Sequence, residues 1–125
     1  MIFTVIIVIL QYTIMGITKT QLFTDEQNEL AMLAKVLGHP ARIAILQHLI
    51  KSDQCINSDL VQELGLAQAT ISQHLKELKQ LNLIKGTIEG ASMCYCINQQ
   101  SWLKIKEKFN QLFDQHPCCS DEECC

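Results

Sequence analysis

The stretch SDLVQELGLAQATISQHLKELKQL, residues 58–81, predicts two short helices joined by a tight turn. In the first helix, Leu60, Val61 and Leu64 share one face at helical spacing. Gly65 follows, and glycine adopts most easily the left-handed conformation that ends a helix. We therefore expect a helix–turn–helix unit at the centre of the chain.

The second helix of this pair begins near Gln68 and has an apolar stripe of Ile71, Leu75 and Leu78. Its other residues are small, polar or basic. Such a face fits the major groove of DNA, where amides and hydroxyls contact base edges and a methyl group contacts thymine. The expected DNA-binding residues of this helix are Gln68, Ala69, Thr70, Ser72, Gln73, His74 and Lys76. Periodicity alone fits an ordinary solvated helix pair equally well.

Longer runs carry a resemblance to a known family: LGHPARIAILQHL at 37–49, CINSDLVQELGLAQATISQHLKELKQLNLI at 55–84 and KGTIEGASMCYCIN at 85–98. With them the chain resembles the ArsR/SmtB family of metal-responsive winged helix-turn-helix repressors. The resemblance implies a mainly α fold with a small β-hairpin wing. It also implies a homodimer formed by the first and last helices, operator DNA as partner, and control of arsenic or antimony resistance genes.

The 125-residue length leaves room for one domain, and the formal net charge is −3. Acidic residues gather near the end of the chain, whereas three lysines outnumber two glutamates between residues 66 and 90. The expected DNA-binding region is thus mildly basic, which predicts modest affinity. We expect its lysines, Lys76, Lys79 and Lys85, to contact phosphates. Arg42 is expected to form a surface ion pair, with a phosphate contact as the alternative.

Flanking elements complete the expected fold. A capping box at 24–27 opens a helix that Gly38 ends, and Pro40 starts another that runs to about Ile50. In that second helix the expected inward residues are Ile43, Leu46, Leu49 and Ile50. Strands at 83–88 and 93–97 form the wing hairpin. A last helix from Asn98 or Ser101 carries a wide apolar stripe, Trp102, Ile105, Phe109, Leu112 and Phe113, which suits pairing with a second subunit.

The first ten residues, MIFTVIIVIL, are almost continuously apolar. The run is shorter than the roughly 18 residues of a membrane span, and it lacks the basic region and cleavage site of a signal peptide. We interpret residues 1–14 as upstream sequence preceding a true start at Met15, with a membrane anchor as the minority alternative. The predicted organisation is an extension at 1–20, a winged helix-turn-helix domain at 21–116, and a cysteine-rich tail at 117–125.

Seven cysteines are present, and an odd number without a convincing signal peptide argues against a secreted disulfide framework. The expected location is cytoplasmic. Cys94 and Cys96 lie on one face of one strand, away from its apolar side. If a short strand at Cys55 and Ile56 joins the wing, Cys55 lies on the same side. Three thiolates without nitrogen or carboxylate suit pyramidal arsenite or antimonite better than tetrahedral zinc.

The tail adds vicinal pairs, Cys118–Cys119 and Cys124–Cys125, as further metal ligands. The arsenite branch of the family often has a Cys-Val-Cys-like motif at the start of the helix pair, whereas this chain has only Cys55 there. The zinc-type site of the family would need Asp114 and His116, which we discount. The function alternatives are a cadmium, lead or redox thiol sensor, or a metal-buffering or interaction protein. No catalytic constellation appears, so we do not expect an enzyme.

Overall fold

The structure, a computed structural model, describes residues 20–52, 56, 60–89 and 92–115. Its contacts group the chain into two units, residues 1–31 and 32–125. The described part of the first unit holds a 3₁₀ turn, η1 (Thr20–Leu22), and the first half of helix α2 (Asp25–Leu37). The predicted extension at 1–20 and tail at 117–125 lie almost wholly outside the described residues, so those boundaries stay predictions.

Helix α2 begins with the predicted capping box. The Gln27 amide N–H donates to Thr24 Oγ1 at 3.2 Å, and the Thr24 N–H donates to Gln27 Oε1 at 3.0 Å. Each side chain therefore satisfies a backbone donor that the helix leaves unpaired. The helix ends at Leu37, and Gly38 follows as the sequence predicts.

Helix α3 (Pro40–Lys51) begins at the predicted proline, and His39 caps it by accepting the Ala41 N–H on Nδ1 at 3.2 Å. The predicted inward face is only partly correct. Leu46 and Leu49 are buried, but Ile43 and Ile50 are 38% and 53% exposed. The residue that completes the buried face is Ile45.

Two shorter elements follow, α4 (Leu60–Leu64) and α5 (Gln68–Gln80). Gly65 ends α4 with a φ of +63°, the left-handed conformation that the sequence predicts. Buried side chains of α3, α4, α5, the first strand and Leu83, which precedes that strand, form one core. It consists of Ile45, Leu46, Leu49, Leu60, Ile71, Leu75, Leu78, Leu83 and Ile84.

Strands β1 (Ile84–Glu89) and β2 (Ser92–Ile97) form an antiparallel hairpin whose register runs from Ile84↔Ile97 to Glu89↔Ser92. Ile56 adds an isolated bridge to Tyr95 on the other edge of β2. The Ile56 N–H donates to the Tyr95 oxygen at 3.0 Å, and the Tyr95 N–H donates back at 2.9 Å. The expected joining of this segment to the wing is therefore confirmed at Ile56, whereas Cys55 lies outside the described residues.

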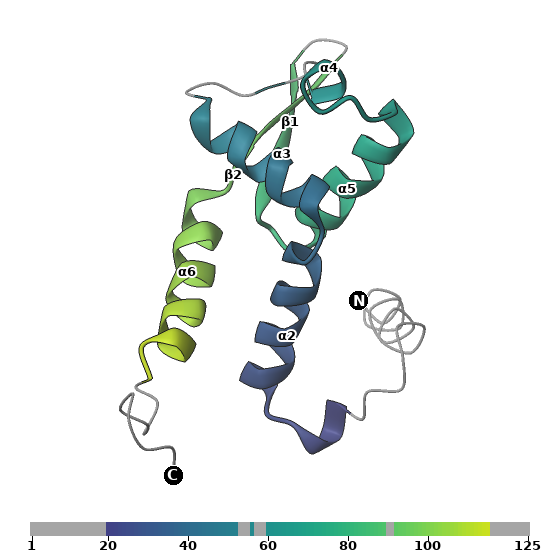
Figure 1. The fold of residues 1–125 in the computed structure, drawn as a ribbon. Helices are drawn as coiled ribbons and strands as arrows, with labels where there is room; N and C mark the ends of the chain where they lie inside the picture. Colours follow the sequence, from purple (N-terminus) through teal and green to yellow (C-terminus); the bar gives the residue numbers. More distant parts are fainter. Residues whose placement is uncertain (1–19, 53–55, 57–59, 90–91, 116–125) are drawn as a thin grey trace, which may run out of the picture. The chain divides into compact units, whose positions relative to one another are not determined.

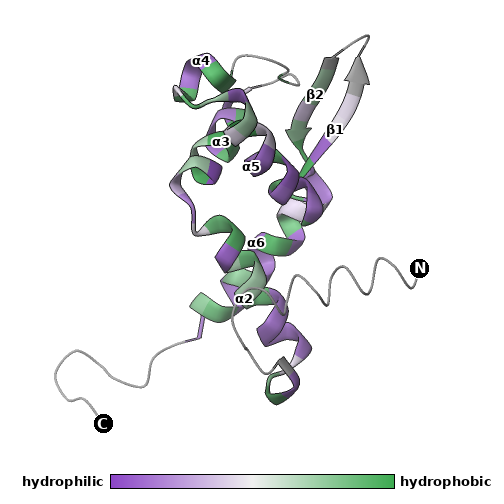
Figure 2. Cartoon of the chain, turned by 90° about the vertical axis from the view of Figure 1, so that its right-hand side faces the viewer, coloured by the Kyte–Doolittle hydropathy of each residue, from purple (hydrophilic) through white to green (hydrophobic). Residues whose placement is uncertain are grey.

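Helix α6 (Gln99–Phe113) is capped by Asn98, whose side chain accepts the Ser101 N–H at 3.4 Å. Trp102 and Ile105 pack against the core, but no residue of this fully described helix is buried. Figure 2 shows apolar and polar residues along α6. The described part of the chain is thus mainly helical with a two-stranded wing, which confirms the winged helix-turn-helix fold (Figure 1). None of its helices has the length and apolar content needed to cross a bilayer.

Candidate nucleic-acid interface

Helix α5 has one buried side and one exposed side. Ile71, Leu75 and Leu78 are buried in the core, as the stripe predicts. Seven of the expected DNA-binding positions are exposed in α5: Gln68, Ala69, Thr70, Ser72, Gln73, Lys76 and Lys79. Their side chains are amides, hydroxyls, a methyl group and ammonium groups. These groups can hydrogen-bond base edges and phosphates.

Polar groups on this side make few local contacts. Gln68 Nε2 donates to Ser72 Oγ at 3.4 Å, and Gln73 Nε2 donates to Glu77 Oε1 at 3.2 Å. Ala67, the residue before α5, has no side chain that caps the first N–H groups of the helix. These N–H groups lie at the N-terminal end of α5, and the N-terminal end of a helix is where anions bind most favourably.

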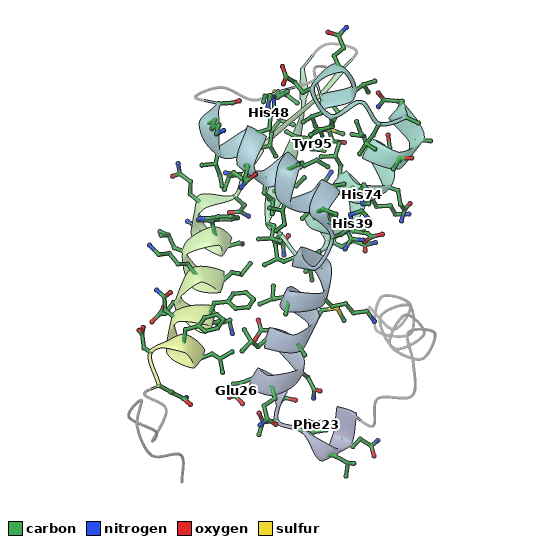
Figure 3. The ribbon with its side chains drawn as sticks, in the orientation of Figure 1. Phe23, Glu26, His39, His48, His74 and Tyr95 are labelled. Atoms are coloured by element: carbon green, nitrogen blue, oxygen red, sulfur yellow. The ribbon has the colours of Figure 1, made fainter. Side chains whose placement is uncertain are left out.

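The His74 side chain is not exposed as the sequence analysis expects. Its side chain is only 7% exposed and its ring centroid lies 4.4 Å from that of His39, near the start of α3 (Figure 3). Its Nδ1 accepts the Arg42 Nε–H at 3.3 Å. The expectation of an outward-facing His74 is therefore wrong. The signal was present in the sequence, because position 74 is the i+3 member of the stripe that begins at Ile71.

The surroundings of His74 favour its neutral form. Burial lowers its pKa below the ordinary 6.5, and the nearby His39 and Arg42 charges lower it further, while Glu77 opposes them. Since Nδ1 accepts a hydrogen bond, the proton of the neutral ring is on Nε2.

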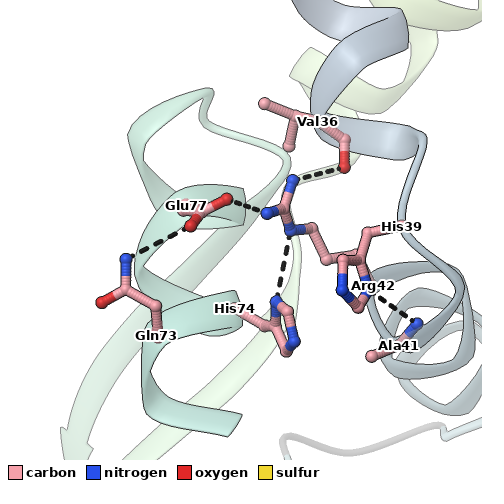
Figure 4. A network of polar contacts seen from close by, with 7 residues as sticks. All are labelled: Val36, His39, Ala41, Arg42, Gln73, His74 and Glu77. Atoms are coloured by element: carbon pink, nitrogen blue, oxygen red, sulfur yellow. Dashed lines mark hydrogen bonds and ion pairs between the residues drawn. The ribbon is translucent and has the colours of Figure 1, made fainter. Parts of the chain in front are cut away.

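Arg42 joins three helices (Figure 4). Its Nη1 donates to the Val36 carbonyl in the last turn of α2 at 2.8 Å, and its Nε donates to His74. Its Nη2 forms an ion pair with Glu77 of α5. The Arg42 side chain is 13% exposed, so the expected ion pair is present but is mostly shielded from solvent.

The wing places one further lysine near α5. Lys85 is exposed on β1, opposite Cys96. The Nζ of Lys79 lies close to Gly86, because a Cβ built on this glycine would be 3.3 Å from it. Lys79 therefore reaches the face of β1 that Gly86 shares with Tyr95, whereas Lys85, the neighbouring residue of the strand, is on the opposite face.

Cys94 and Cys96 share one face of β2 and Met93, Tyr95 and Ile97 share the other, as predicted. The expectation that the cysteines face away from the buried side is wrong for Cys94. Only Cys96 is partly exposed, whereas Cys94 is 2% exposed. Among the described residues, no group of three His, Cys, Asp or Glu side chains is close enough to hold a metal ion. The other candidate ligands lie outside those residues: Cys55, Cys118, Cys119, Cys124 and Cys125.

The fold and the polar face of α5 define a winged helix-turn-helix protein. The family model described as "Bacterial regulatory protein, arsR family" matches residues 39–85. The transcriptional repressor PagR of Bacillus anthracis is 34% identical over 68 residues, which are 54% of this chain and 68% of PagR. The chain belongs to the arsR family of bacterial regulatory proteins.

Two further comparisons agree. The HTH-type transcriptional regulator Rv0081 of Mycobacterium tuberculosis is 35% identical over 63 residues, 50% of this chain and 55% of Rv0081. The chain thus spans about half the length of this relative. An ArsR-like regulator from Rhodococcus sp. RHA1 has the same fold, with a TM-score of 0.61 at 23% identity over 73% of this chain and 85% of that one. Rv0081 is named a transcriptional regulator and PagR a transcriptional repressor, and neither is named an enzyme.

Proposed function

We propose that the protein is a dimeric transcriptional repressor that binds operator DNA through α5 and leaves it when thiolates bind arsenite or antimonite. The observation that carries the DNA-binding part is the exposed polar side of α5, held against the core by a fully buried apolar stripe. PagR, which is 34% identical to this chain over 68 residues, is named a transcriptional repressor.

Within the proposed interface, Thr70 and Gln73 are the central base-contacting residues. Both are exposed in the first two turns of α5, and hydroxyl and amide groups are suited to base edges in the major groove. Lys76, Lys79 and Lys85 supply phosphate contacts around them. His74 supports the helix from its buried side and contacts no base.

The proposed dimer uses α6. Phe113 is 74% exposed and Leu112 is also exposed, and the Phe109 and Phe113 rings stack with centroids 6.5 Å apart. Exposed aromatic rings of this size favour burial against another apolar surface. A second copy of α6 supplies one, and a two-fold dimer would place two α5 helices on successive major grooves of a palindromic operator.

The proposed inducer site begins with Cys94 and Cys96. Two residues along a strand separate their Cα atoms by about 6.6 Å, near the upper limit of about 6.8 Å for a disulfide. An ion bound by both sulfurs needs no sulfur–sulfur bond, and thiolates select soft metals and metalloids. Cys55 precedes Ile56 of the bridge by one residue and is the proposed third ligand; the tail cysteines are proposed as an additional capture site.

The DNA-binding part is tested with duplexes from upstream of the protein's own gene. Wild-type protein should shift them, and Thr70→Ala with Gln73→Ala should abolish the shift. Gln80→Ala is the matched control, since it removes an exposed amide from the other end of α5. Unchanged binding by the double variant would refute this placement of the interface.

The inducer part is tested on the DNA complex. Arsenite, antimonite, cadmium, lead and peroxide are added separately, and arsenite or antimonite should release wild-type protein at the lowest concentration. Cys94→Ser with Cys96→Ser should stay on DNA in arsenite. Normal release of that variant would move the site to other cysteines, and preferential release by cadmium, lead or peroxide would replace the metalloid with that inducer.

A further inference from the structure

The guanidinium of Arg42 is the one polar group that ties α5 to both α2 and α3 in the contacts of the described residues. It comes from α3, reaches the Val36 carbonyl of α2, and meets both His74 and Glu77 of α5. His74 and Glu77 are three residues apart and so lie on one face of the helix. Figure 4 shows the three contacts converging on one side chain.

Apolar packing alone would hold α5 less specifically. The Ile71, Leu75 and Leu78 stripe keeps the helix against the core, but hydrophobic contact is non-directional. Hydrogen bonds from a planar guanidinium are directional and fix the orientation of their partners. Two such contacts to successive turns of α5 therefore define its rotation about its own axis.

The same network of contacts extends to the exposed polar side of α5 that is proposed to bind DNA. The Glu77 carboxylate that pairs with Arg42 also accepts the Gln73 amide at 3.2 Å. Gln73 is exposed and is a proposed base contact. The orientation of its side chain is thus set in part by an arginine on another helix.

We propose that Arg42 is the positioning residue of the DNA-binding helix: it fixes the rotation of α5 against the α2–α3 corner and, through Glu77, orients Gln73. This inference depends on the proposed DNA-binding function of α5. It differs from a phosphate contact, because the charge of Arg42 is balanced by Glu77 and each of its three nitrogens already has a protein partner.

The network also makes DNA binding sensitive to acid. The Arg42 Nε–H needs the lone pair on His74 Nδ1, and protonation of that nitrogen removes the acceptor and sets two cations against each other. The charged and titratable groups around His74 are His39 before α3, Arg42 of α3 and Glu77 of α5. Only Glu77 favours the protonated ring.

Arg42→Lys is the decisive variant, because lysine keeps the positive charge but carries all its N–H donors on one nitrogen and cannot reproduce the planar arrangement of three nitrogens. The affinity for operator duplex is measured by fluorescence anisotropy over a range of salt concentrations. We expect a loss of affinity of about tenfold or more, since hydrogen bonds to charged groups are among the stronger ones in proteins. The slope of log K against log salt should stay at the wild-type value.

Lys76→Met is the control for a phosphate contact, and it should reduce the magnitude of that slope by about 0.9 for each subunit, or about 1.8 for the proposed dimer. His74→Asn is the second variant, because its amide oxygen can replace Nδ1 as an acceptor without titrating. It should bind DNA with near-wild-type affinity at pH 7.5 and lose less affinity than wild type between pH 7.5 and pH 5.5.

The outcomes separate the two proposals. If wild type binds and Arg42→Lys binds equally tightly, or if Arg42→Lys reduces the salt slope as Lys76→Met does, the positioning role is overturned. Should Arg42→Lys fail to fold, ¹⁵N NMR of wild-type His74 decides, and a proton on Nδ1 at neutral pH overturns the network. If wild type binds no duplex from its own upstream region, the proposed function falls first and the inference with it.

Discussion

The His74 ring stabilises the folded protein only while it is neutral. Its folded-state pKa lies below 6.5, whereas in the unfolded chain it returns to that ordinary value. Between the two values the unfolded state binds more protons, so the free energy of unfolding falls as the pH drops. The contribution is complete above about pH 6.5 and is lost as the pH falls toward the folded pKa.

Urea unfolding between pH 8 and pH 5 tests this prediction. The midpoint for wild type should fall on acidification, and the midpoint for His74→Asn should fall less. The difference between the two proteins isolates His74 from the other histidines. Parallel curves would contradict it.

Residue-level predictions succeeded where a periodic pattern was simple. The stripe of α5 and the exposure of Thr70, Gln73 and Lys76 follow from helical spacing. The burial of Cys94 could not be predicted, because strand alternation gives the side of a residue but not what covers that side. The partners of Arg42 could not be predicted from the sequence either, since they include a residue 35 positions away along the chain.

At the level of elements, Gly65 is needed for the end of α4. Its φ of +63° is strained for any residue with a Cβ, and no atom lies within 4 Å of the added carbon. Gly65→Ala should therefore destabilise the protein by about 1–2 kcal/mol through the backbone alone. Gly65→Asn should cost less, because asparagine tolerates this conformation, and thermal unfolding of the two variants provides the comparison.

Helix α3 shows why a helix can be predicted while its buried face is not. The run Ile43–Ala44–Ile45–Leu46 is apolar almost all round, so periodicity gives no preferred side. In the folded protein Ile45, Leu46 and Leu49 are buried, whereas Ile50 is exposed. The boundaries of α3 were predictable because Pro40 fixes its first turn.

Two substitutions in α3 test which of its isoleucines is buried. Ile45→Ala should lower the free energy of unfolding by about 2–5 kcal/mol, since it leaves a cavity in the core. Ile50→Ala removes a similar volume from a half-exposed site and should change it by less than about 1 kcal/mol. Equal losses would show that both side chains are buried in the protein in solution.

At the level of the whole molecule, the exposed apolar end of α6 predicts an assembly. Phe113→Glu should convert a dimer to a monomer and weaken operator binding, because one α5 helix then contacts one half-site. Light scattering after size exclusion measures the mass. Gln111→Glu, an equal change of charge on an exposed residue of the same turn, should leave the dimer intact.

Tyr95 connects two parts of the molecule that a chemical signal would need to join. It stands between Cys94 and Cys96 in β2, and its peptide exchanges both hydrogen bonds with Ile56, four residues ahead of α4. A ligand that pulled the two flanking sulfurs together would bend the strand at this tyrosine. In the proposed inducer response, the two hydrogen bonds between Tyr95 and Ile56 would carry this bend to the chain that leads into the helix–turn–helix.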